Sequence, residues 1–279
     1  MNFVTGMIPT LTTVVYHHAA ELLLLVLMRG HMADFSRNEL LNGLPSPEQS
    51  IIAAHLVDVN INEGHMLYNA GDIIRDVHFP TTAIVSMMNV MRDGQTVEVA
   101  SVGHEGMVGL RLFYEDDEAI ARATCLVPGH AHKIPAEKFW PLLHEHPGIR
   151  HIIHQYAHAC QFEVFQYAAC NKIHTFPQRL ARWLLTNEDR SNRRTFPLEQ
   201  AKIGAILDVS IPRVRDMLHH LRDRGIMEFR GEQLSIINRP GLERIACECY
   251  ERVQVELFKI GVRRRAMQSR MPGDHPDIS

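Results

Sequence analysis

The most informative stretch of the sequence runs from residue 196 to residue 227 and reads FPLEQAKIGAILDVSIPRVRDMLHHLRDRGIM. Apolar residues recur at helical spacing on both sides of Asp208, which predicts a helix over about 198–207, a tight turn and a second helix. Asp208 tolerates the left-handed conformation that such a turn needs. We expect Ser210 at the N-cap of the second helix, Pro212 in its first turn and Gly225 at its end. The pattern is typical of a helix-turn-helix.

Each of the two helices has an apolar side that is expected to be buried. In the first helix these residues are Ala201, Ile203, Ile206 and Leu207, and in the second they are Val214, Leu218 and Leu221. A hairpin over 227–237, turning at Arg230 and Gly231, follows the second helix and is a candidate wing.

The side chains left exposed near the start of the second helix are of the types that a recognition helix presents to DNA. Arg213 and Arg215 can bind phosphate or read a guanine edge, and Asp216 can accept from cytosine or orient an arginine. The residues expected to contact DNA are Gln200, Ser210, Ile211, Pro212, Arg213, Arg215, Asp216 and Arg230.

The charge is unevenly distributed along the 279 residues, although the formal net charge is only −3. Residues 37–171 hold 8 Lys/Arg and 16 Asp/Glu, a net charge of −8. Residues 172–230 hold 12 Lys/Arg and 7 Asp/Glu, a net charge of +5. An acidic front and a basic back predict two functions, with the basic part facing an anionic partner. The composition, 46% hydrophobic and 22% charged, excludes a wholly disordered or collagen-like chain.

The rest of the chain divides into recognisable segments. Residues 36–57 read as two short helices, the first capped by Ser36 and the second opened by Pro47. Residues 58–134 hold short alternating runs between turn residues, and Asp93 with Gly94 predicts a hairpin. A short helix over 135–144 precedes a long one over about 149–174. Its stripe is a candidate dimer interface formed by Ile149, Ile152, Ile153, Tyr156, Cys160, Val164 and Tyr167.

This order of parts resembles the Crp/Fnr (cyclic-AMP receptor protein / fumarate–nitrate regulator) family of transcription regulators. The most specific segments are 208–227, 239–243 (RPGLE) and 102–109 (VGHEGMVG). The resemblance implies an α+β fold and a cytoplasmic homodimer that reads palindromic double-stranded DNA, with RNA polymerase as a further partner. The expected division is an extension outside the fold (1–35), a cyclic-nucleotide-binding-like β-roll (36–147), a dimerisation helix (148–174), a winged helix-turn-helix (175–250) and a helical end with a disordered tail (251–279).

The sensor pocket departs from the family pattern. Cyclic-nucleotide binders in this family carry a Glu for the ribose hydroxyl and an Arg for the phosphate. By resemblance Leu110, between Gly109 and Arg111, replaces the Glu, while Ala119, followed two residues later by Ala121, replaces the Arg. A phosphate buried without a cation is costly, so we expect that cyclic AMP is not bound in the family manner and we predict no cofactor.

Metal and redox sites are not expected from the sequence. The five cysteines include no CxxC pair, and Cys247 and Cys249 are closer than the usual metal clip. His151, His154 and His158 share one helical face and are the alternative metal ligands. No transmembrane segment is expected, and residues 1–31 are interpreted as loosely ordered or lying before the true start.

Two rival functions stay open. One is an interaction module without DNA binding, since Ile211 and Pro212 stand where relatives commonly carry polar base readers. The other is an enzyme using His104 and Glu105, although no nucleophile with a base and an orienting group is legible.

Overall fold

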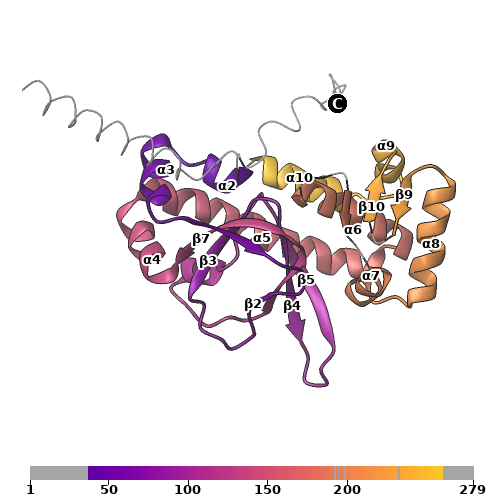
Figure 1. The fold of residues 1–279 in the computed structure, drawn as a ribbon, viewed down its shortest axis with the longest axis horizontal. Helices are drawn as coiled ribbons and strands as arrows, with labels where there is room; N and C mark the ends of the chain where they lie inside the picture. The colour runs from indigo at the N-terminus through magenta and orange to yellow at the C-terminus, as the bar shows by residue number, and fades with distance from the viewer. Residues whose placement is uncertain (1–36, 192, 194, 198, 232, 260–279) are drawn as a thin grey trace, which may run out of the picture. The chain divides into compact units, whose positions relative to one another are not determined.

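The computed structural model describes residues 37–191, 193, 195–197, 199–231 and 233–259 (Figure 1). Ser36, the extension before it and the tail after residue 259 lie outside the described residues, so the predictions about them stay predictions. The N-terminal elements are α2 (Glu39–Asn42), α3 (Ser46–Ala53), β1 (Val57–Ile61), β2 (Met66–Tyr68), β3 (Asp76–Pro80), β4 (Ile84–Val90), β5 (Thr96–Val102), the 3-10 helix η2 (Leu110–Tyr114), β6 (Arg122–Val127), β7 (Gly129–Pro135) and α4 (Ala136–Glu145).

The strands between residues 57 and 135 form two antiparallel sheets, with orders β1-β7-β3 and β2-β6-β4-β5. Residues from both sheets bury their inward side chains in one apolar core, which α2, α4 and the start of α5 complete. The hairpin of β4 and β5 turns at Gly94, whose φ of 85° suits the predicted Asp93–Gly94 turn. This is the β-rich domain that the sequence predicts.

The two short helices predicted before β1 are present, but the residue that caps the first one differs from the prediction. Asn38 is the N-cap of α2, and its side chain accepts from the backbone N–H of Leu41. Pro47 lies in the first turn of α3, as predicted, where its missing N–H costs nothing.

The long helix α5 spans Pro147–Ile173. Different parts of its apolar stripe pack against different regions of the same chain. Ile149, Ile152, Ile153 and Tyr156 pack into the core of the β-rich domain. Cys160 also packs against this core, Tyr167 packs against the cluster that Ala159 forms with two residues of α10 (Cys249–Lys259), and Val164 is exposed. The prediction that the whole stripe is a dimer interface is therefore wrong for its first half, because a nearby apolar sheet face covers that half.

The C-terminal elements after α5 are α6 (Phe176–Ser191), β8 (Thr195–Pro197), α7 (Gln200–Leu207), α8 (Ile211–Asp223), β9 (Met227–Arg230), β10 (Gln233–Ile236) and α9 (Arg239–Glu243). Their core is built from α6, α7, α8 and a three-stranded sheet of order β8-β10-β9, and Ile84 of β4 with Leu126 and Val127 of β6 belongs to the same apolar cluster. The predicted α+β fold, with a β-rich domain, a long helix and a winged helix-turn-helix, is confirmed. None of the described helices is long and apolar enough to cross a membrane.

Candidate functional site

The helix-turn-helix turn has the predicted backbone geometry. Asp208 adopts the left-handed conformation with a φ of 52° and ends α7. Gly204 allows the turn to close, because a Cβ there would lie 2.7 Å from the carbonyl oxygen of Val209. Of the predicted buried residues of α7, Ile203 and Leu207 are buried and Ile206 is half-buried against the same core. The prediction for Ala201 is wrong, because this residue is exposed on roughly the opposite side of the helix from Ile203.

Helix α8 presents one buried side and one exposed side, as predicted. Val214, Leu218 and Leu221 are buried in the C-terminal core. Ser210 occupies the N-cap position, but its side chain makes no capping hydrogen bond, and Pro212 lies in the first turn. Gly225, with a φ of 65°, follows the end of the helix.

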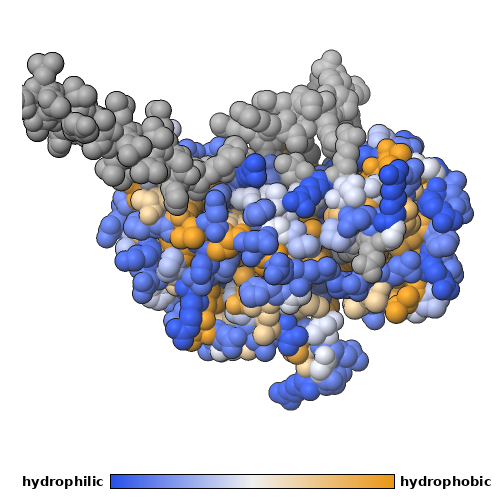
Figure 2. All heavy atoms as spheres, in the orientation of Figure 1, coloured by the Kyte–Doolittle hydropathy of each residue, from blue (hydrophilic) through white to orange (hydrophobic). Residues whose placement is uncertain are grey.

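The charged residues predicted to meet DNA lie exposed on the first half of α8. Arg215 Nε lies 3.9 Å from Asp216 Oδ1, so this carboxylate is placed to orient an arginine. The Arg213 guanidinium carbon lies 5.4 Å from the ring centroid of Phe176, at the start of α6. Ile211 and Pro212 are also exposed, beside these charges. Figure 2 shows mostly hydrophilic atoms over the outer edge formed by α8.

The two remaining predicted contacts lie on other elements. The Arg230 side chain is 88% exposed at the end of β9, beside the hairpin turn at Gly231. Gln200 is the half-buried first residue of α7. The structure thus brings the exposed arginines of α8 and Arg230 of the hairpin together in one small domain.

The residues aligned with the cyclic-nucleotide ligands lie in and beside η2. Gly109 has a φ of 104° and precedes η2, whose first residue, Leu110, packs against the core of the β-rich domain. Arg111 forms an ion pair with Asp116, and its Nε–H donates to the carbonyl oxygen of Glu118. Its charge is therefore partnered within the loop that carries it.

The second stretch that the resemblance matches to the pocket, residues 119–121, holds no charged side chain. Ala119 and Ala121 are buried, and Ala123 of β6 follows them on the buried side. Arg122 is half-buried between them, and its Nε–H donates to Asn69 Oδ1 over 3.0 Å. Burial therefore alternates from residue to residue along 119–123, as it does in a strand with one buried face.

A half-open cavity that the sequence did not indicate lies along β2 and β3, with lining residues that include Tyr68, Arg75 and His78. The pKa of His78 falls to about 4, mainly because burial disfavours its charged form. No sequence motif predicts this cavity, because its lining residues come from β2, from β3 and from the turn between these two strands.

The segment 102–109 contacts α6 and α5 rather than forming an acid–base pair. Arg190 of α6 is buried, and its Nε–H donates to Glu105 over 2.7 Å while its Nη2 group donates to Glu163 of α5 over 2.7 Å. Burial opposes the charge of Arg190, but Glu163 and Glu105 outweigh it and raise the arginine pKa. His104 Nδ1 donates to the carbonyl oxygen of Arg190 over 2.9 Å. We call Glu105, Glu163, Arg190 and His104 the buried junction.

Two glycines of the same segment permit this packing. A Cβ at Gly103 would lie 2.5 Å from the Arg190 carbonyl oxygen, and one at Gly106 would lie 2.0 Å from the Tyr156 hydroxyl oxygen. The glycines of the 102–109 motif therefore serve the close contact between the β-rich domain and the helices that lead to the helix-turn-helix.

Comparison with known families identifies both domains. Residues 58–146 match the model of the cyclic nucleotide-binding domain, and residues 178–245 match the Crp-like helix-turn-helix domain. No curated protein matches the chain.

Solved structures share the fold at low sequence identity. The c-di-GMP responsive global regulator CLP of Xanthomonas campestris is 14% identical with a TM-score of 0.55, over 69% of this chain and 99% of that one. FixK2 from Bradyrhizobium japonicum is 18% identical with a TM-score of 0.54, over 69% and 98%. A transcriptional regulator of the CRP family from Thermus thermophilus is 16% identical with a TM-score of 0.56, over 67% and 96%.

Proposed function

The chain belongs to the Crp/Fnr family of transcription regulators, and on that premise we propose that it is a homodimer that reads a palindromic DNA operator. The observation that carries the proposal is the exposed first half of α8, where Arg213 and Arg215 flank the buried stripe of Val214, Leu218 and Leu221 on its two sides. A helix that is held by its apolar side and carries exposed arginines can enter the major groove. DNA contacts are proposed for Gln200, Ser210, Ile211, Pro212, Arg213, Arg215, Asp216 and Arg230, and binding to chromosomal DNA places the protein in the cytoplasm.

The proposed dimer uses the part of α5 that its own chain leaves uncovered. His154, His158, Gln161, Phe165 and Ala168 are exposed at spacings of four, three, four and three. Phe165 is 68% exposed, and a second copy of the chain packed along this face would remove its large apolar ring from water. This spacing fits a second copy of α5 packed along it, which would set two α8 helices about one DNA turn apart.

The proposed sensor pocket does not bind cyclic AMP in the family manner. Leu110 points its apolar side chain into the core, Ala119 offers no charge, and Arg111 is paired with Asp116. A buried phosphate would therefore lack the cation that offsets its desolvation. Calorimetric titration with cyclic AMP should give no binding in the micromolar range, and micromolar affinity would refute this part of the proposal.

The function is tested by selecting fragments of the source genome, and of random DNA, on the purified full chain. We expect an enriched palindrome and an affinity that falls steeply with salt, because phosphate binding releases counterions. Light scattering should give twice the chain mass, and Phe165→Glu should give the mass of one chain. No retention of DNA at low salt would overturn the proposal and favour the interaction module, whose binding partner would then be sought.

A further inference from the structure

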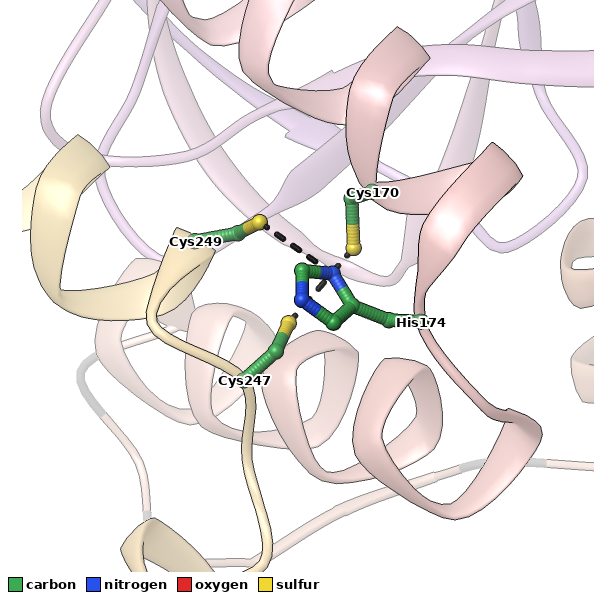
Figure 3. A group of neighbouring side chains, drawn as sticks. All are labelled: Cys170, His174, Cys247 and Cys249. Carbon is green, nitrogen blue, oxygen red and sulfur yellow. Dashed lines mark hydrogen bonds between the residues drawn. The ribbon is translucent and has the colours of Figure 1, made fainter.

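Three cysteines and one histidine from distant parts of the sequence meet at the C-terminal end of α5 (Figure 3). Cys170 lies on the last turn of α5, and His174 follows four residues later at its C-cap. Cys247 and Cys249 come from the segment that opens α10. One possible ligand atom from each of these four residues lies within 4.8 Å of all the others, and no other such group of His, Cys, Asp or Glu occurs in the part of the chain that the structure describes.

We infer that Cys170, His174, Cys247 and Cys249 bind one structural Zn²⁺ ion that fastens the start of α10 to the end of α5. This inference lies beyond the proposed DNA-binding function and revises the sequence-based prediction of no metal. Binding would release the protons of the three thiols to solvent, as zinc binding to cysteine requires the thiolate form.

The distances within the group suit a single tetrahedral ion. Cys170 Sγ lies 3.5 Å from Cys247 Sγ, and Cys249 Sγ lies 3.5 Å from His174 Nδ1. Around a tetrahedral Zn²⁺ with Zn–S bonds of about 2.3 Å, neighbouring sulfurs lie about 3.8 Å apart. An iron–sulfur cluster spreads its cysteines over several irons, so its ligand atoms lie further apart than these.

The surroundings of the four residues support metal ligands rather than four ordinary core side chains. His174 turns Nδ1 toward the sulfur of Cys249, and its Nε2 lies 3.1 Å from a carboxylate oxygen of Glu248. A carboxylate on the far nitrogen of a ligating histidine fixes its tautomer and raises its basicity. The Gln166 amide donates to Cys249 Sγ over 3.1 Å, which suits a thiolate.

Burial and charge favour a structural role. The three cysteines are buried. Four protein ligands occupy all the coordination positions of a tetrahedral Zn²⁺ ion, so no position stays open for a substrate or a catalytic water. Three thiolates with Zn²⁺ carry a net negative charge, and the buried guanidinium of Arg182 interacts electrostatically with Cys170 and Cys247. The histidines that the sequence offered only as alternative metal ligands, His151, His154 and His158, are all exposed and do not form such a group.

The first experiment measures metal and sulfide in the full chain, purified without a histidine tag or chelator. We expect about one zinc per chain in the native protein and in Cys160→Ser, and loss of that zinc in Cys247→Ser. Cys160 is a matched control because it lies on α5 outside the group. Zinc retained in Cys247→Ser, iron with sulfide, or a metal-free protein with a Cys170–Cys247 disulfide would each overturn the inference.

A second experiment does not depend on how well a cysteine variant folds. Glu248→Gln keeps all four ligands, and by loss of the carboxylate on His174 it should weaken zinc affinity about 10- to 100-fold in competition with a chelator. Adding Co²⁺ to the metal-stripped protein should give the visible absorption of a tetrahedral cobalt–thiolate site. Absence of that absorption, or an unchanged zinc affinity in Glu248→Gln, contradicts the proposed site. Neither readout involves DNA, so its failure leaves the proposed function untouched.

Discussion

The arginines of the C-terminal half fall into two groups with opposite surroundings. Arg190 is buried between Glu105 and Glu163, whereas Arg213, Arg215 and Arg230 are exposed. Each of these arginines adds one unit to the net charge of +5 counted over residues 172–230, whether it is buried or exposed. Only the exposed group is free to meet phosphate, because the charge of Arg190 is already used to hold two carboxylates. A count of charges therefore overstates the basic surface that this domain offers to DNA.

The largest expected effect is a loss of folding stability when the buried arginine, Arg190, is replaced. Arg190→Met should lower the free energy of unfolding by about 3–5 kcal/mol, because it leaves Glu105 and Glu163 buried without their cation. Urea unfolding followed by circular dichroism measures the change. Arg215→Met is the matched exposed control and should stay within about 0.5 kcal/mol of the parent. Equal losses in the two variants would show that the buried junction does not carry the stability assigned to it.

The next largest effect concerns the exposed arginines, and it should appear in DNA affinity and not in folding stability. Arg213→Ala should weaken binding to the selected operator by about 1–3 kcal/mol if the guanidinium reads a guanine, and it should relax preference at that base. Fluorescence anisotropy with operator and mutated operators measures both. Arg222→Ala, on the same helix but paired with Asp223 near its end, is the control. A loss no larger than that of the control would remove Arg213 from the proposed interface.

A smaller effect is expected at the hairpin. Arg230→Ala should weaken binding to all DNA sequences about equally, because a phosphate contact carries no sequence information. The slope of log affinity against log salt should become shallower by about 1 if the side chain binds one phosphate. Binding isotherms at several salt concentrations give the slope. An altered sequence preference with an unchanged slope would mean that Arg230 reads bases and not the backbone.

The smallest effect is a pH dependence of the buried junction. Burial opposes the charge of His104, but its hydrogen bond with Glu39 and the charges of Glu105 and Glu39 outweigh burial and raise its pKa. A raised folded-state pKa gives stability that is fully present below the unfolded value of about 6.5 and lost as the pH rises through the folded value. The free energy of unfolding should therefore fall over this window more steeply in the parent than in His104→Gln. Parallel pH profiles from urea unfolding would contradict this assignment.

The helix-turn-helix was predictable because its signals are local. Each of these signals acts within a few residues of its own position. They are the left-handed Asp208, the proline in the first turn of α8, and Gly225 just after the end of that helix. The same local reasoning was wrong for Ala201, which is exposed on roughly the opposite side of α7 from the buried Ile203. Ser210 holds the N-cap position without the side-chain bond expected of it.

The long helix shows what an apolar stripe in the sequence can and cannot predict. Its apolar period predicted a helix correctly, but a period does not say which surface covers the stripe. The structure places Ile149 to Tyr156 against the sheets of the same chain and leaves Phe165 uncovered. The face proposed for the dimer is therefore a different one, rich in histidine and read from the sequence only as a metal alternative.

By itself, the sequence determined the order of the β-rich domain, the long helix and the helix-turn-helix, and it predicted that Leu110 and Ala119 replace the usual cyclic-nucleotide ligands. These follow from local periodicity, turn chemistry and the residue types at single positions. Only the tertiary structure decided which arginines stay available and which cysteines meet. Cys170 and Cys247 are 77 positions apart, and Glu105 and Arg190 are 85 apart. Contacts over such separations depend on how whole elements pack, and no local pattern encodes them.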